Sequence, residues 1–230
     1  MRHAVVTGTS SGIGAAITRR LLDDGFQVTG LDRSAATIEA AGFTAIAVDL
    51  ADPAARSAAL DALDARAASA PVTAIVHAAG IMRGAPLGAL DPATGELLWR
   101  IHVDAAIALA DRLVPRMGAG GRVVLIGSRA ARGVVQKSQY GAAKAALVGL
   151  AKSWAKEVAP RGITINVVAP AATDTGMLAD PARAVIPPET PPFGRLIRPQ
   201  EIAALVAFLL SDEAAAITGQ EIAICGGASL

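Results

Sequence analysis

The chain has a single cysteine and very few aromatic side chains: one tyrosine, two tryptophans and four phenylalanines among 230 residues. One cysteine excludes an internal disulfide and is typical of a reducing compartment. Hydrophobic residues make up 53% of the chain and aromatics only 3%, so the core has to be aliphatic. The formal net charge of +1 argues against the basic footprint of a nucleic-acid-binding domain.

Long apolar runs are also missing. No uncharged apolar stretch reaches the roughly 18 residues that a membrane span needs, and the first residues lack the basic, apolar and small-residue pattern of a signal peptide. We therefore expect a cytoplasmic protein without a membrane partner. The three histidines, His3, His77 and His102, show no metal-ligand spacing, so no metal site is predicted.

Strand-like and helical stretches alternate along the chain. The predicted strands are residues 4–7, 27–31, 44–48, 74–77, 122–126, 164–168 and 221–224, and helical patterns include residues 54–68, 95–117, 138–159 and 200–210. This alternation predicts an α/β fold: a doubly wound, mostly parallel Rossmann sheet of about seven strands with helices on both faces. The length fits one domain, residues 1–230.

One long irregular segment, residues 171–199, follows the sixth predicted strand and contains six prolines. Prolines at this density make a continuous helix improbable. Doubly wound sheets bind ligands at the carboxyl ends of their strands. The segment is therefore interpreted as a substrate lid; a surface loop without function is the alternative.

The only tyrosine, Tyr140, stands four residues before Lys144. In a helix this spacing places both side chains on one face, one turn apart. An ammonium about 5 Å from a phenol favours the phenolate by roughly 3 kcal/mol at an effective dielectric near 20. The pKa of the phenol, ordinarily about 10, then falls towards the range of efficient acid–base catalysis. Alone, the pair is a weak signal, and a helix that happens to carry a tyrosine and a surface lysine would be the better interpretation.

A glycine-rich turn follows the first predicted strand and opens a helical stretch. Gly8 permits a tight turn, and Gly12 and Gly14 let a pyrophosphate approach the backbone. The start of the helix supplies free N–H groups for the phosphates. Strand, glycine turn and helix in this order predict a dinucleotide site.

These motifs resemble the short-chain dehydrogenase/reductase family over nearly the whole chain. The matches are residues 7–14 with Thr-Gly-x-x-x-Gly-x-Gly, 48–50 with the acidic residue beside the adenine, 79–80 with the end of Asn-Asn-Ala-Gly, Ser128 twelve residues before Tyr140, 170–175 beside the nicotinamide, and 194–195, 218–220 and 226–227 in the C-terminal region. The resemblance implies hydride transfer between a nicotinamide cofactor and a small-molecule alcohol or ketone, with Ser128, Tyr140 and Lys144 as catalytic residues.

The glycine turn and the resemblance together predict which residues hold the cofactor. They are Gly8, Ser11, Gly12, Ile13, Gly14, Asp32, Asp49, Leu50, Ala79, Gly80, Tyr140, Lys144, Pro170, Thr173 and Thr175. The resemblance also implies a homo-oligomer, a tetramer or dimer packed through residues 95–117 and 138–159.

Several positions depart from the family pattern. His77 and Ala78 stand where the family has two asparagines, and His102 aligns with a further catalytic asparagine. We hypothesise that His102 replaces this asparagine as a hydrogen-bonding relay behind Lys144, since imidazole offers one donor and one acceptor and can carry a proton. A packed helix residue without a catalytic part is the alternative.

The predicted cofactor is NAD. The second strand runs into Asp32, eighteen residues after Gly14, where a carboxylate accepts hydrogen bonds from the ribose and repels a 2′-phosphate. Residues 9–11 are neutral, whereas family members that choose the phosphate carry a basic residue there; Arg33 argues the other way. The alternatives are an NADPH-dependent 3-oxoacyl-thioester reductase of the same family and a non-catalytic nucleotide-binding relative.

Four basic residues, Arg83, Arg129, Arg132 and Lys137, follow the Gly80 turn and Ser128 near the expected mouth of the site. They indicate either an anionic substrate or a solvated rim, and the solvated rim is the more common arrangement.

Overall fold

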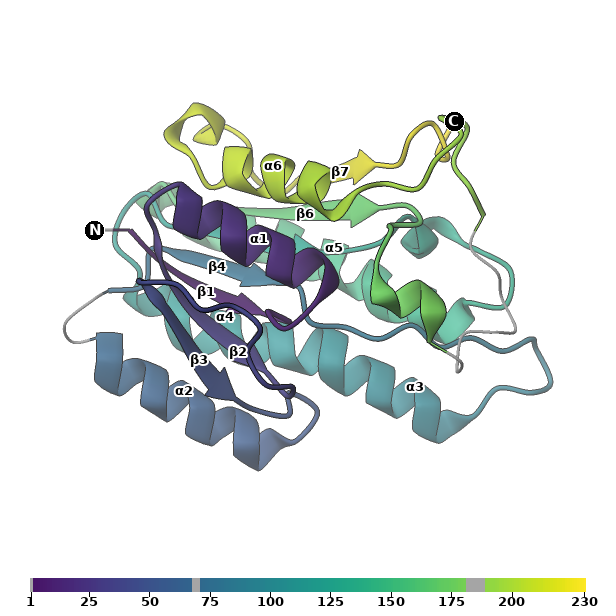
Figure 1. The fold of residues 1–230 in the computed structure, drawn as a ribbon, viewed down its shortest axis with the longest axis horizontal. Coiled ribbons are helices and arrows are strands. Elements are labelled where there is room, and N and C mark those ends of the chain that lie inside the picture. The colour runs from purple at the N-terminus through teal and green to yellow at the C-terminus, as the bar shows by residue number, and fades with distance from the viewer. Residues whose placement is uncertain (1, 68–70, 181–188) are drawn as a thin grey trace.

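A computed structural model describes residues 2–67, 71–180 and 189–230 and contains the predicted parallel sheet (Figure 1). Its seven strands lie in the order β3-β2-β1-β4-β5-β6-β7, and every neighbouring pair is parallel. The strands are β1 His3–Thr7, β2 Gln27–Asp32, β3 Phe43–Ala47, β4 Ala74–His77, β5 Arg122–Ile126, β6 Thr164–Pro170 and β7 Glu221–Ile224. The fold class predicted from the sequence is confirmed.

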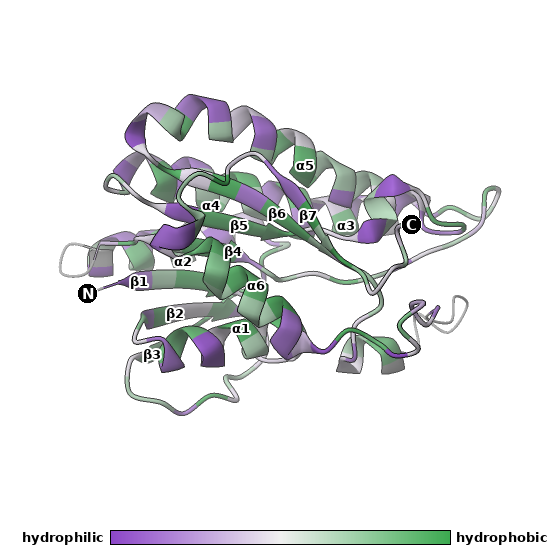
Figure 2. Cartoon of the chain, turned by 90° about the horizontal axis from the view of Figure 1, so that it is seen from above, coloured by the Kyte–Doolittle hydropathy of each residue, from purple (hydrophilic) through white to green (hydrophobic). Residues whose placement is uncertain are grey.

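Helices cover both faces of the sheet, as the turned view in Figure 2 shows. On one face lie α1 Gly12–Asp23 and α6 Pro199–Leu209. The other face carries α2 Pro53–Ala67, α4 Ala105–Leu113 and α5 Ser138–Val158. Fully buried strands read as continuous apolar runs, and in β1 Val5 joins the core under α2, α4 and α5 while Val6 joins the core under α1 and α6.

The helix predicted over residues 95–117 is interrupted. It consists of α3 Pro92–Trp99, a π-helical turn Arg100–Asp104, α4 and a 3-10 turn Val114–Arg116. Apolar periodicity does not distinguish a π turn from an α turn, because one extra residue leaves most of the apolar face in place. The turn carries His102, whose side chain is buried.

Short 3-10 helices complete the fold. They are Arg129–Arg132, Ala159–Arg161, Gly176–Ala179 and Asp212–Ala214. No helix within the described part of the chain combines the length and the apolar character required to cross a membrane.

The segment predicted as a lid, residues 171–199, is described only in part, because residues 181–188 lie outside the described residues. Its first part forms the 3-10 helix Gly176–Ala179, and its end reaches the first residue of α6. Thr173 pairs with Ile197 in a parallel bridge, so the two ends of the segment meet beside the carboxyl end of β6.

Candidate active site

A cavity of about 930 Å³ lies where the strands β1, β2, β4, β5 and β6 end. All of the residues predicted as catalytic or cofactor-binding line it. They are Gly8, Ser11, Gly12, Ile13, Gly14, Asp32, Asp49, Leu50, Ala79, Gly80, His102, Ser128, Tyr140, Lys144, Pro170, Thr173 and Thr175. Parallel strands bring these positions together because their carboxyl ends meet at one edge of the sheet.

The glycine turn at this edge leaves no room for side chains. A Cβ on Gly14 would lie 2.0 Å from the carbonyl oxygen of Gly8, and a Cβ on Gly8 would lie 2.9 Å from Ala79. Gly8 and Gly12 also have φ angles of 76° and 54°, in the region that favours glycine. The turn therefore brings bare backbone to the cavity, as an approaching pyrophosphate requires.

The start of α1 suits an anion. Ser11 is its N-cap residue, and the Ser11 side chain makes no capping hydrogen bond, so it leaves the N–H groups of the first turn to other acceptors. A helix N-terminus with free N–H groups and a favourable dipole binds phosphate. These features fit the pyrophosphate of a dinucleotide.

Asp32 closes the turn from the end of β2. Its Oδ2 accepts a hydrogen bond from the Ser10 N–H (2.9 Å), and its Oδ1 accepts one from the Ser34 N–H (2.9 Å). An ionised carboxylate has about four acceptor sites, so two sites stay available to ribose hydroxyls. Arg33, the residue whose charge argues against a preference for NAD, also lines the cavity.

Ser128 follows β5 and caps the 3-10 helix Arg129–Arg132, where its Oγ accepts a hydrogen bond from the Ala130 N–H (3.1 Å). The α5 helix begins close by, because Gly141 lets its first turn approach this 3-10 helix. A Cβ on Gly141 would lie 2.8 Å from the carbonyl oxygen of Ala130. This contact brings Tyr140, the preceding residue, to the wall that holds Ser128.

Lys144 is buried behind Tyr140, with only 4% of its surface exposed. Its Nζ donates a hydrogen bond to the carbonyl oxygen of Ile126 (2.6 Å) and lies 5.9 Å from the centre of the Tyr140 ring. Burial lowers the pKa of Lys144 from 10.5 to about 7. The sequence alone predicts a permanently charged lysine here, because neither the burial of Lys144 nor the weakening of its charge has a local signal.

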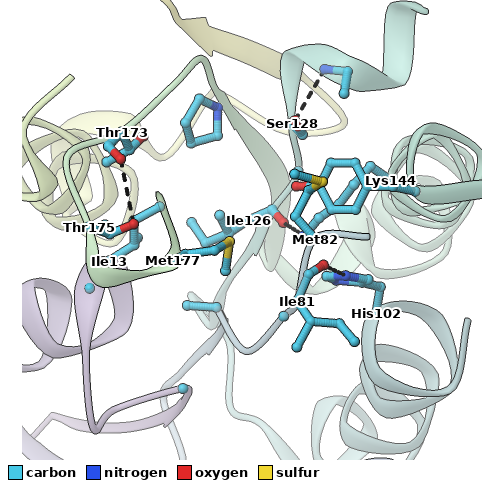
Figure 3. A pocket seen from close by; sticks show the side chains of 18 of the residues that line it. Ile13, Ile81, Met82, His102, Ile126, Ser128, Lys144, Thr173, Thr175 and Met177 are labelled. Carbon is cyan, nitrogen blue, oxygen red and sulfur yellow. Dashed lines mark hydrogen bonds between the residues drawn. The ribbon is translucent and has the colours of Figure 1, made fainter. Parts of the chain in front are cut away.

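His102 forms the wall next to this pair. Its Nε2 donates a hydrogen bond to the carbonyl oxygen of Ile81 (2.9 Å; Figure 3). The His102 ring also meets the Tyr140 ring edge-on, with 5.6 Å between the ring centres. Gly80 makes room for the imidazole, since a Cβ there would lie 2.3 Å from His102 Cε1. The structure therefore places His102 beside Tyr140 and Lys144 and not on an outer helix face.

The opposite wall comes from the segment after β6. Figure 3 shows Thr173, Thr175 and Met177 of this segment, with Ile13 of α1 beside them, across the cavity from Ser128 and Lys144. Sequence reasoning missed Met177, as it missed Met82, because nothing in either neighbourhood forms a motif. Both thioethers are suited to an apolar ligand of variable shape.

The basic residues at the rim are largely neutralised. Arg83 pairs with Asp180 (2.8 Å), Arg129 with Glu189 (3.8 Å) and Arg132 with Glu221 (3.3 Å). These pairs favour the solvated-rim interpretation over an anionic substrate. In the part of the chain that the structure describes, no group of three or more His, Cys, Asp or Glu side chains is arranged to hold a metal.

The arrangement fits acid–base chemistry beside a nucleotide. A phosphate-binding turn, a hydroxyl, a phenol and a buried lysine face one cavity that is large enough for a dinucleotide and a second small molecule.

Comparisons with known proteins agree with this geometry. A sequence profile described as Enoyl-(Acyl carrier protein) reductase matches residues 8–229. The 3-oxoacyl-[acyl-carrier-protein] reductase of Escherichia coli is 38% identical over 236 residues, which cover 97% of this chain and 96% of that protein. The cis-4-hydroxycyclohexanecarboxylate dehydrogenase of Sinomonas cyclohexanicum is 36% identical over 241 residues, covering 98% and 96%.

Solved structures share the fold over the full chain. A short chain dehydrogenase family protein from Francisella tularensis superposes with a TM-score of 0.89 at 27% identity, covering 100% of this chain and 99% of that one. Similar structures contain either nicotinamide cofactor. A blue fluorescent protein from a metagenomic library holds NADPH (30% identity, TM-score 0.85, coverage 100% and 98%), and a 3-ketoacyl-(acyl-carrier-protein) reductase from Brucella melitensis holds NADH (26%, 0.87, 100% and 98%). The chain belongs to the short-chain dehydrogenase/reductase family of oxidoreductases.

Proposed function

We propose that this protein interconverts a secondary alcohol and a ketone with NAD(H) as cofactor. The observation that carries the proposal is the convergence of Ser128, Tyr140 and Lys144 on the cavity that also receives the glycine turn of α1. The cofactor, when bound, supplies or accepts the hydride.

The protein's own residues manage the proton and the oxygen. Ser128 donates a hydrogen bond that fixes and polarises the substrate oxygen. Tyr140 gives its phenolic proton to that oxygen in reduction and takes it back in oxidation. Lys144 is held by the Ile126 carbonyl, stabilises the phenolate and contacts the ribose of the nicotinamide half.

NAD is proposed as the cofactor because a carboxylate, Asp32, lies at the end of β2 where the adenosine ribose is expected. A 2′-phosphate would bring nearly two further negative charges to that carboxylate. Ser10 and Ser11 in the turn offer no basic side chain to offset them. Arg33 is the one cation beside Asp32 that lines the described cavity.

The substrate is proposed to be an uncharged, largely apolar molecule, because the rim arginines are paired and Met82 and Met177 line the cavity. The segment 171–199 is proposed to act as the lid over it. Two residues of this segment, Asp180 and Glu189, form ion pairs with Arg83 and Arg129 on the opposite wall.

A homo-oligomer, a tetramer or dimer, is also proposed. Leu97 and Trp99 on α3 and Ile107 on α4 are each at least 39% exposed. Apolar side chains on neighbouring turns are typical of an interface. Light scattering of the purified protein tests this proposal, and a monomer at micromolar concentration contradicts it.

A second candidate is an NADPH-dependent 3-oxoacyl-thioester reductase. The 38% identity with the Escherichia coli 3-oxoacyl-[acyl-carrier-protein] reductase favours it. It shares the Ser128, Tyr140 and Lys144 chemistry with the first proposal and differs in substrate and cofactor.

One assay separates these candidates. Nicotinamide absorbance is followed with NADH and NADPH against a panel of ketones and a 3-oxoacyl thioester, and in the reverse direction with secondary alcohols. We expect turnover with NADH and a simple ketone. Turnover confined to NADPH and the thioester supports the second candidate, and binding of nucleotide without turnover of any substrate indicates a non-catalytic relative.

A further inference from the structure

Two buried histidines lie at the back of the cavity. His77 ends β4 and is 0% exposed, and His102 sits in the π-helical turn and is 1% exposed. In each ring one nitrogen makes a hydrogen bond: His77 Nδ1 with Thr7 and His102 Nε2 with the Ile81 carbonyl. The other nitrogens, His77 Nε2 and His102 Nδ1, are buried and have no hydrogen-bond partner among the described residues. A buried polar group without a partner typically costs about 1–3 kcal/mol, so two in one site call for an explanation.

The hydrogen bonds of Thr7 fix the tautomer of His77. Thr7 Oγ1 accepts hydrogen bonds from the N–H groups of Ala78 (3.0 Å) and Ala79 (2.9 Å), which occupy both of its lone pairs. Its remaining contact, to His77 Nδ1 at 3.0 Å, is therefore donated by its own O–H. Nδ1 of His77 is the acceptor, and the neutral ring carries its hydrogen on Nε2.

The tautomer of His102 follows from a simpler argument. Its Nε2 lies 2.9 Å from the carbonyl oxygen of Ile81, which can only accept. Nε2 thus carries the hydrogen, and Nδ1 presents a bare lone pair. Both rings stay neutral, because burial and the charge of Lys144 lower the pKa of His77 to about 3 and that of His102 well below its ordinary value.

The two unpartnered atoms are complementary: His77 Nε2 is a donor and His102 Nδ1 is an acceptor. The charge of Lys144 lowers the pKa of both rings. The carbonyls of Ile101 and His102 in the π turn lie near the His77 ring. These carbonyls raise the pKa of His77, but neither satisfies hydrogen-bond geometry to Nε2. Geometry places the three side chains in one neighbourhood. His77 pairs with Leu125 in the sheet, next to Ile126, whose carbonyl holds Lys144 Nζ, and His102 and Lys144 both lie against the Tyr140 ring, at 5.6 Å and 5.9 Å from its centre.

We propose that His77 and His102 are positioning residues that join the nucleotide turn to Lys144 through one buried water molecule. The water accepts hydrogen bonds from His77 Nε2 and Lys144 Nζ and donates to His102 Nδ1, three bonds in all, as a buried water typically makes. The chain of hydrogen bonds begins at Thr7, immediately before Gly8. The inference rests on the proposed function for the role of Lys144, and it assigns the histidines orientation and not proton transfer.

The first test needs no turnover. Imidazole ¹⁵N shifts of the cofactor-free protein are recorded between pH 6 and 9, with His77→Asn and His102→Asn used for assignment. Both rings are expected to be neutral with the hydrogen on Nε2 throughout. A hydrogen on Nδ1 of either ring, or titration of either ring near its ordinary pKa of about 6.5, overturns the proposal.

The second test removes the hydroxyl that orients His77. Thr7→Val is compared with Thr7→Ser, which keeps a hydroxyl and serves as the matched control. We expect Thr7→Val to give His77 a mixture of tautomers and to lower kcat about 10-fold, whereas Thr7→Ser keeps both readouts near wild type. If Thr7→Val leaves the His77 tautomer and kcat unchanged, the connection is wrong.

A third measurement separates orientation from packing. His102→Asn restores a donor and an acceptor of smaller size, and His102→Leu removes both while filling the space. Rescue of kcat by asparagine and a loss of about 10-fold with leucine support the polar role; equal kcat in both variants overturns it. If wild type turns over no substrate, the proposed function fails, while the ¹⁵N spectra still decide the arrangement of the histidines.

Discussion

Lys144 shows how burial changes what one residue can do. Its ammonium is removed from water, and among the described residues Nζ donates a hydrogen bond to a neutral carbonyl, that of Ile126. Desolvation disfavours the charged form, which is why its pKa falls to about 7. Near neutral pH both the protonated and the neutral form of this lysine are populated, a condition that suits proton exchange with the adjacent Tyr140 phenol.

Lys144 also predicts a pH dependence of stability. Its pKa is lower in the folded protein, about 7, than in the unfolded chain, 10.5, so the unfolded state binds more protons between these values. Stability contributed by this site therefore rises with pH from about 7 to about 10.5, with a slope of at most about 1.4 kcal/mol per pH unit.

The measurement compares the free energy of unfolding of wild type and Lys144→Met by denaturant titration at several pH values. We expect the wild type to gain on the variant steadily across this interval, because methionine has no proton to lose. The Lys144→Met variant also loses the hydrogen bond to the Ile126 carbonyl, and this loss lowers its free energy of unfolding by the same amount at every pH. A difference that does not vary with pH would mean that Lys144 keeps its ordinary pKa in the fold.

Asp32 carries the prediction of cofactor preference. We expect kcat/KM with NAD(H) to exceed that with NADP(H) by a factor of about ten or more, equivalent to about 1.4 kcal/mol. Asp32→Ala removes the repelling carboxylate and should narrow this ratio. Asp49→Asn is the matched control, since it removes a carboxylate charge from the same cavity. It should change kcat/KM with NAD(H) and with NADP(H) by the same factor. Comparable values for both cofactors in wild type would refute the preference.

At the scale of elements, the β1–turn–α1 unit is fixed by contacts between backbone atoms. Gly14 lies against the carbonyl of Gly8, and Gly8 lies against Ala79 after β4. No rotamer change can relieve a clash with backbone, so the turn tolerates only glycine at these positions.

Gly14→Ala is therefore expected to destabilise the fold by about 1–3 kcal/mol and to weaken nucleotide binding at least about tenfold. The matched control is Gly149→Ala in α5, where a Cβ would meet nothing within 4 Å. That exposed helical position should gain about 0.5–1 kcal/mol, because alanine loses less backbone entropy than glycine. Thermal unfolding and calorimetric titration with NAD measure both effects. Equal behaviour of the two variants would show that the turn is not sterically tight.

At the scale of the whole molecule, much of the fold could be predicted because its signals are local. Short apolar runs bounded by glycine and polar residues mark the strands, and each predicted strand lies within two residues of the observed one. The spacing of Tyr140 and Lys144 and of the glycines is also local. Parallel topology then brings such positions to one edge of the sheet without further information.

The remaining features depend on tertiary contacts. Arg83 and Asp180 are 97 residues apart in the chain, and nothing near either residue indicates that they pair. The bond between Thr7 and His77 spans 70 residues, and it gives His77 a role where the sequence showed only a lost amide. The π turn at His102 was hidden because apolar periodicity continues across it.

The central claim is that Tyr140 exchanges a proton with a substrate held beside a nicotinamide cofactor. The most direct test is Tyr140→Phe, with hydride transfer followed by nicotinamide absorbance and NAD binding measured by calorimetry on the same preparation. Loss of one positioned acid–base group predicts a fall in kcat of about 10²–10⁴, with nucleotide affinity nearly intact. Turnover at the wild-type rate in Tyr140→Phe would contradict the account.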